Sequence, residues 1–122
     1  MAYSTYADVL AATGTALPQA TVETLIAMAD REIDSYLKLY NVTGSGSDPA
    51  VMSASLNLSI CNVLTRYRMD GTKEVQTLEF TDKTPIDTAI DSYKKSAYQA
   101  LKNYVKTTTT AGRFFVGEVV GQ

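Results

Sequence analysis

The sequence predicts a mainly α-helical protein: a small bundle of three long helices plus a short N-terminal helix, with an extended loop or short β segment before the last helix and an extended C-terminal arm. Apolar residues recur at alternating steps of three and four over long segments, which is the spacing of one helix face. Pro, Gly, Asp, Ser and Thr stand between these segments, where helices begin and end. With 122 residues, 45% of them hydrophobic and 20% charged, the chain has the size and composition of one folded domain.

The first predicted helix is short. Ser4 and Thr5 can cap its start, because a hydroxyl oxygen accepts a hydrogen bond from a free N–H of the first turn. Gly14 suits the left-handed conformation that ends many helices. The apolar side chains between these ends are Tyr6, Val9 and Leu10.

The second predicted helix has Pro18 in its first turn, where proline removes no needed donor. Its apolar stripe consists of Val22, Ile26, Ala29, Ile33, Tyr36 and Tyr40, with Leu25 and Leu37 flanking it. The opposite face, interpreted as solvated, carries Glu23, Asp30, Arg31, Glu32, Asp34 and Lys38. Residues 41–47 are small and polar, and they are expected to form a connector.

The third predicted helix is capped by Asp48, has Pro49 at its first position and runs to about Met69. No charged residue lies between Asp48 and Arg66, so this helix needs neighbours on more than one side. It is either the central helix of the bundle, or it also binds a second chain on its Ser/Ala/Asn side. The expected stripe is Val51, Met52, Leu56, Ile60, Val63, Leu64 and Tyr67.

The segment 72–82 is threonine-rich and partly alternating, which favours a short strand or an extended loop. Thr84 and Pro85 then open the last helix. Its inward stripe is Ile86, Ile90, Tyr93, Ala97, Leu101, Tyr104 and Val105. The β-branched Thr107–Thr110 and the following Gly112 are expected to end it. Residues 1–106 are therefore assigned to a helical domain and residues 107–122 to an extended arm of the same unit.

Composition argues against several classes of function. The chain has no histidine, and its one cysteine, Cys61, lies in an uncharged helix where burial would leave the thiol inert. We therefore predict that the protein is not an enzyme and has no catalytic residue, metal or cofactor. A net charge of -2 offers no broad basic surface for nucleic acid. No apolar run reaches the roughly 18 residues that a membrane-spanning helix requires.

Two segments, YSTYADVLAATG (residues 3–14) and LIAMADREIDSYL (residues 25–37), carry a resemblance to a known family. Together with the order and length of the elements over residues 3–106, they resemble the head-tail adaptor proteins of tailed phages and prophages, also called head completion or connector proteins. The resemblance implies a mainly α-helical structural protein of the virion neck, made in the host cytoplasm and associated with no membrane.

The resemblance also implies the partners. Identical subunits, typically twelve, would form a ring beneath the portal protein and contact the stopper or tail-completion protein below. Double-stranded DNA would pass through the ring without sequence-specific binding. A neutral or acidic lining would let the DNA slide, and Asp30 and Asp34 are the candidates to face the channel.

Loops and terminal segments would grip the portal and neighbouring subunits. The candidates in the C-terminal arm are Arg113, Phe114, Phe115, Val116, Val119 and Val120, and those in the extended segment are Lys73, Val75, Leu78 and Phe80. Two possibilities stay open for the arm. It folds back on its own chain, pairing with residues 75–80 as a small sheet, or it docks onto a neighbouring subunit or the portal.

A small helical binding module, such as a DNA-binding regulator or an antitoxin, is the alternative. A short helix followed by a second one can imitate a helix-turn-helix. The charged residues of the second helix, however, are mostly acidic, and acidic side chains repel the phosphates of DNA.

Overall fold

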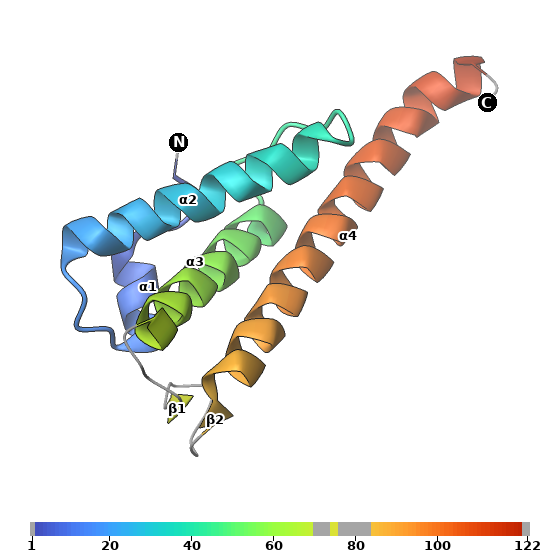
Figure 1. Ribbon diagram of the computed structural model, residues 1–122. Helices are drawn as coiled ribbons and strands as arrows, with labels where there is room; N and C mark the ends of the chain where they lie inside the picture. The colour runs from blue at the N-terminus through green and yellow to red at the C-terminus, as the bar shows by residue number, and fades with distance from the viewer. Residues whose placement is uncertain (1, 70–73, 76–83, 121–122) are drawn as a thin grey trace.

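The computed structural model describes the backbone of residues 2–69, 74–75 and 84–120, and the side chains of residues 2–69 and 85–108. The helices within these ranges are α1 (Tyr6–Thr13), α2 (Gln19–Lys38), α3 (Pro49–Met69) and α4 (Ile86–Val120), and the short strands are β1 (Glu74–Val75) and β2 (Thr84–Pro85). The helix α3 packs against each of the other three helices (Figure 1). The predicted mainly α-helical bundle is confirmed.

The helix α1 is built as its sequence predicts. The hydroxyl of Thr5 accepts a hydrogen bond from the N–H of Asp8, and the Asp8 carboxylate accepts one from the N–H of Thr5, each at 3.2 Å. Gly14 ends the helix with φ of 62°, and its N–H donates to the carbonyl of Leu10 at 2.7 Å. Both ends of this eight-residue helix therefore have hydrogen-bond partners.

The helix α2 begins one residue after Pro18 and buries one face against α3. Two positions differ from the predicted stripe. Leu37, expected at its edge, is 1% exposed, whereas Tyr40 is 48% exposed. The helix ends at Lys38 and Asn41 has φ of 57°, so the helical periodicity no longer applies at Tyr40. The Tyr40 ring instead packs against that of Tyr36, with 5.3 Å between ring centroids and 51° between ring planes.

The helix α3 is buried on several sides, as its lack of charge predicts. The expected stripe is wrong at Met52, which is 43% exposed. The Ser/Ala/Asn side is partly filled by this chain itself: Ser55 donates to Asp30 at 2.6 Å, and Asn62 donates to the carbonyl of Leu25 at 3.0 Å. These contacts place Ser55 and Asn62 inside the bundle, and a second chain on the rest of that side stays a prediction. The buried residues of the helix are Val51, Ala54, Ser55, Leu58, Ser59, Ile60, Cys61, Val63 and Leu64.

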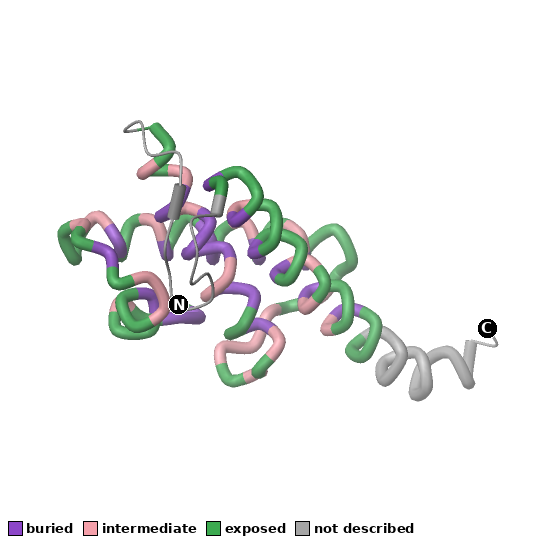
Figure 2. The backbone as a smooth tube through the Cα atoms, turned by 90° about the horizontal axis from the view of Figure 1, so that it is seen from below, coloured by how far each residue is buried: buried purple, intermediate pink, exposed green. Residues whose placement is uncertain are grey.

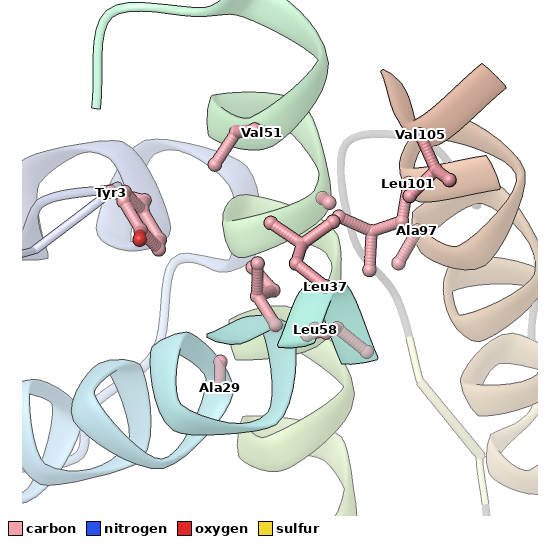
Figure 3. Packing of buried hydrophobic residues seen from close by; sticks show 10 residues of the cluster. Tyr3, Ala29, Leu37, Val51, Leu58, Ala97, Leu101 and Val105 are labelled. Carbon is pink, nitrogen blue, oxygen red and sulfur yellow. The ribbon is translucent and has the colours of Figure 1, made fainter. Parts of the chain in front are cut away.

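The largest buried cluster lies where α2, α3 and α4 meet (Figure 3). Leu37 of α2, Leu58 of α3 and Leu101 of α4 are at most 2% exposed and belong to this cluster. In Figure 2 the buried positions of α4 recur along one side of the helix and exposed positions cover the other. This amphipathic pattern explains why α4 packs along α3.

The strands β1 and β2 form an antiparallel pair just before α4. Glu74 pairs with Pro85 and Val75 pairs with Thr84. An extended segment before the last helix is thus confirmed at residues 74–75. The helix begins at Ile86 rather than at Pro85, because residues 84–85 belong to the strand pair.

The predicted end of the last helix is wrong. The helix α4 has 35 residues and continues through Thr107–Thr110 and Gly112 to Val120, where an extended arm was expected. A threonine in a helix costs at most about 0.7 kcal/mol and a glycine about 1 kcal/mol relative to alanine. The packed part of α4 already supplies the helical nucleus, so each later residue needs only propagation.

Candidate functional site

The N-terminal segment is fastened to the bundle by Asp30. The N–H of Tyr3 donates to one carboxylate oxygen of Asp30 at 3.0 Å, and the hydroxyl of Ser55 donates to the other at 2.6 Å. The hydroxyl of Ser4 lies 2.7 Å from that of Ser55. Because the single hydroxyl hydrogen of Ser55 is directed at Asp30, Ser4 is the donor in this contact. We call Asp30, Ser55, Ser4 and the Tyr3 N–H the Asp30 anchor.

The Asp30 anchor overturns one interpretation of the sequence. Asp30 is 6% exposed, so its assignment to a solvated face is wrong. Both carboxylate oxygens of Asp30 accept hydrogen bonds inside the bundle, so Asp30 does not face a channel. Asp34, one turn along α2, is exposed.

The side chain of Tyr3 extends from the anchor to the connector that follows α2. Its hydroxyl donates to Asp34 at 2.6 Å. Burial, and then the hydrogen bond to the Asp34 carboxylate, raise the pKa of Tyr3 to about 12. A Cβ on Gly44 would lie 2.7 Å from the Tyr3 hydroxyl, so glycine permits the close approach of the connector. Tyr3 therefore joins the N-terminus, α2 and the connector.

An open groove with a volume of about 710 Å³ lies between the N-terminal segment and α2. The half-buried Tyr6 and the buried Ile26, which is 4% exposed, line it, and the exposed charged residues at its edge are Glu23, Arg31 and Asp34. The remaining lining residues are Ala2, Ser4, Thr5, Ala27 and Asp30. Apolar surface bordered by charges of both signs suits a protein segment better than a phosphate or a metal ion.

Another side of α2 is closed by tyrosines. The hydroxyl of Tyr98 on α4 donates to the Glu32 carboxylate, and the Tyr98 ring meets Tyr36 edge-on, with 5.4 Å between centroids. Burial, and then the bond to Glu32, raise the pKa of Tyr98. These tyrosines connect α2 to α4, so they act as packing residues.

The candidate interface residues of the extended segment are only partly described. Lys73, Leu78 and Phe80 lie outside the described residues. Val75 lies in β1, and its partner is Thr84 of β2. The C-terminal segment is helical to Val120, so the expected sheet between it and residues 75–80 is wrong.

The C-terminal candidates all lie in the last eight residues of α4. The side chains of Arg113, Phe114, Phe115, Val116, Val119 and Val120 are outside the described residues, and only their helical backbone is given. Among the described side chains of α4, the last buried one is Val105, and residues 106–108 are exposed. In Figure 1 the helix extends past the ends of α2 and α3.

The described residues include one cysteine, and they hold no cluster of metal-ligating side chains. No three histidine, cysteine, aspartate or glutamate side chains among them are placed to hold a metal ion. Burial raises the pKa of the Cys61 thiol to about 12, although the charge of Lys94 lowers it. The Sγ of Cys61 donates to the carbonyl of Ile90 at 3.3 Å. No helix of the described chain is both long and apolar enough to cross a membrane.

Sequence reasoning missed the Asp30 anchor and the groove beside it, although one signal was present. Ile26, Asp30, Ile33 and Leu37 follow the four-three-four spacing of the buried face, so Asp30 interrupts an apolar stripe. A carboxylate at such a position indicates a buried acceptor with partners.

Comparison with protein-family models, with curated proteins and with solved structures finds no match.

Proposed function

We propose that this protein is a structural head-tail adaptor of a tailed phage or prophage, whose copies form a ring beneath the portal and connect the capsid to the stopper or tail. The resemblance of residues 3–14 and 25–37 to such adaptors is the starting point. The mainly α-helical fold agrees with it, and the net charge of -2 suits a ring through which DNA slides.

The observation that carries the proposal is the length of α4. Val105 is its last buried residue among those described, yet the helix continues to Val120. At 1.5 Å per residue, this end is about 20 Å long. This end only propagates from the packed part of α4, but its four threonines and Gly112 have low helix propensity, and most helical stability in proteins comes from packing. A partner that packs on it would supply the missing stability.

The sequence of this end suits such a partner. Helical spacing assigns Phe115, Val116, Val119 and Val120 to one side of the helix. An apolar stripe on a projecting helix is the recognition element of helix-in-groove binding. The portal protein and a neighbouring subunit are the partners that an adaptor would offer it.

A matched pair of substitutions at Gly112 tests the proposal. Proline at this position removes a helical hydrogen bond and costs about 3 kcal/mol, whereas alanine favours the helix. We expect Gly112→Pro to lower incorporation into portal-bearing heads at least about tenfold and Gly112→Ala to keep it, because about 3 kcal/mol corresponds to more than a tenfold change. Incorporation is measured by co-sedimentation of the purified full chain with tail-less heads that carry the portal encoded in the same genome.

Two results would count against an adaptor. One is failure of the unaltered chain to sediment with portal-bearing heads when it does sediment with some other complex from the same lysate. The other is a purified particle whose neck lacks this polypeptide in cryo-electron microscopy. Portal, capsid and tail genes beside its own gene are the expected genomic setting, and a toxin gene there would favour an antitoxin instead.

A further inference from the structure

We propose that one exposed face of α4, which carries Lys95, Lys102 and Lys106, binds the phosphate backbone of double-stranded DNA without reading its sequence. We call these three residues the lysine stripe. The inference goes beyond the proposed function, because an adaptor ring only has to let DNA pass, and the binding itself depends on neither a ring nor a portal.

The lysine stripe follows the solvent side of α4. Its residues are spaced at steps of seven and four, which places them along one line of a helix, about 17 Å long from Lys95 to Lys106. All three lysines are exposed, whereas Ala97 and Leu101 are buried on the side of α4 that packs along α3. In Figure 2 exposed positions follow the outer side of this helix. The stripe is therefore accessible along its whole length.

Nearby carboxylates do not balance the positive charge of this face. Residues 92–108 contain four lysines and no acidic residue, although the whole chain has a net charge of -2. Asp91 lies one turn before Lys95, but within the described chain neither Lys95 nor Lys102 forms an ion pair. A solvated helix face commonly mixes charges of both signs, which can pair at a spacing of three or four residues. The lysine stripe instead presents a cationic surface to an anionic partner.

The helix dipole does not account for the position of these lysines. A cation stabilises a helix through the dipole only within about the last turn. Lys102 and Lys106 would lie there if the helix ended at the four threonines, but α4 continues to Val120. Lys106 therefore lies about four turns before the end of the helix, in its interior.

The other exposed side chains around the stripe also suit phosphate oxygens. Besides lysines, the exposed residues between 92 and 108 are Gln99, Asn103, two serines and two threonines. Amide and hydroxyl groups, like ammonium groups, donate hydrogen bonds to the phosphates of DNA. The Nε2 of Gln99 donates to the Oδ1 of Asn103 at 3.3 Å, which holds the Asn103 amide beside the stripe with its NH₂ still available as a donor.

The same composition argues against other anionic partners. None of the exposed residues between 92 and 108 is aliphatic or aromatic. Protein interfaces are enriched in aromatic residues and depleted in lysine and serine. A helix on a membrane surface inserts apolar side chains, and single-stranded nucleic acid stacks its bases on aromatic rings. The backbone of double-stranded DNA needs only cations and hydrogen-bond donors, which are the groups that this face offers.

Fluorescence anisotropy of a labelled duplex of about 20 base pairs, titrated with the full chain at salt concentrations from about 20 to 200 mM, tests this contact. Each neutralised phosphate contributes about -0.9 to the slope of log K against log salt, so three lysines predict a slope of about -3. Lys95→Gln/Lys102→Gln should change the slope to about -1 and weaken binding at about 50 mM salt at least about tenfold. Lys95→Arg/Lys102→Arg should keep the slope and the affinity.

The matched control is Lys38→Gln/Arg66→Gln, which removes the same charge from exposed positions of α2 and α3. It should keep the slope near about -3. Duplexes rich in A·T and in G·C should bind within about twofold of each other, because phosphate contacts carry no sequence information. Circular dichroism of each variant shows whether the fold is kept.

This inference and the proposed function fail separately. Three results would overturn the stripe as a DNA contact: no salt-dependent binding by the unaltered chain, equal losses in the folded stripe and control variants, or tighter binding to the single strand or to poly-glutamate than to the duplex. Each of them leaves the adaptor function standing if the chain still sediments with portal-bearing heads. Lysine-dependent binding by a chain that does not join those heads supports the stripe and overturns the adaptor function alone.

Discussion

The hydroxyl of Ser55 donates a 2.6 Å hydrogen bond to the buried carboxylate of Asp30, and this bond joins the N-terminal part of α3 to the centre of α2. One turn further along α3, Ser59 is equally buried, at 0% exposure, but its hydroxyl has no hydrogen-bond partner within the described chain. The two serines occupy equivalent positions on one helix face and differ in whether their polar group is satisfied.

Replacing each serine by alanine should therefore change stability in opposite directions. Ser55→Ala removes a hydrogen bond to a charged group and should lower the free energy of unfolding by about 1.5–3 kcal/mol. Ser59→Ala removes an unsatisfied hydroxyl and should raise it by about 1 kcal/mol. Urea unfolding followed by circular dichroism measures both. Equal destabilisation by the two substitutions would show that Ser59 has a partner in solution.

The Asp30 anchor should be the main attachment of the N-terminus. Asp30→Ala leaves the Tyr3 N–H and the Ser55 hydroxyl without acceptors in a buried site. It should lower the free energy of unfolding by about 3 kcal/mol. Asp30→Asn keeps one acceptor oxygen, so its cost should be smaller. Hydrogen exchange of the Tyr3 amide measures the attachment directly and should accelerate in both variants, most in the alanine variant.

The matched comparison for this anchor is Asp34→Asn. Asp34 is exposed and accepts only from the Tyr3 hydroxyl among the described contacts, so this substitution should cost less than about 1 kcal/mol and leave the Tyr3 amide protected. A loss of amide protection as large as that of Asp30→Ala would mean that the tyrosine side chain, not the buried carboxylate, attaches the segment.

Most helices were predictable because their boundaries depend on local chemistry. Thr5 and Gly14 cap α1, and Pro49 opens α3, at the positions that their side chains favour. The end of α4 was not predictable from Thr107–Thr110, because the low helix propensity of threonine competes with propagation from a long packed helix. Local propensity therefore failed where the tertiary structure had already nucleated the helix.

The candidate site was less predictable than the fold, because its parts are distant in sequence. The Tyr3 N–H and Asp30 are 27 positions apart, and Ser4 and Ser55 are 51 apart. Only the phase of Asp30 within the α2 stripe indicated a buried carboxylate, and nothing local indicated its donors. The groove follows from how the N-terminal segment crosses α2, which no periodicity encodes.

Alkaline pH should destabilise the chain. Burial raises the pKa of Cys61 from 9.0 to about 12, and burial with the bond to Asp34 raises that of Tyr3 from 10.0 to about 12. Both groups are neutral when protonated, so the folded chain keeps these protons at pH values where the unfolded chain loses them. Their contribution to stability is complete below pH 9 and is lost as the pH rises from 9 to 12.

Urea unfolding at pH 8, 9.5 and 11 checks this dependence, with Cys61→Ala as the control. This variant should be somewhat less stable at pH 8. Its free energy of unfolding should begin to fall nearer pH 10 than pH 9, because Tyr3 in the unfolded chain loses its proton near pH 10. The thiol of the unaltered chain should react with a disulfide reagent only as fast as the chain unfolds, because Cys61 is 5% exposed. Rapid reaction in folded protein would contradict its burial.

Removal of residues 109–122 should separate assembly from folding. Leu101 is 0% exposed and Val105 is 9% exposed, and both remain in the shortened chain together with the whole described core. The free energy of unfolding should therefore change by less than about 0.5 kcal/mol, whereas Leu101→Ala in the full chain should lower it by about 2–5 kcal/mol through loss of core packing. Thermal and urea unfolding give these values.

Co-sedimentation with portal-bearing heads gives the effect on assembly. The shortened chain should stay folded but no longer be incorporated into the heads. Folded Leu101→Ala protein, at a temperature below its unfolding transition, should still be incorporated. If the shortened chain instead unfolds like the leucine variant, the end of α4 packs on its own bundle and is not available to a partner.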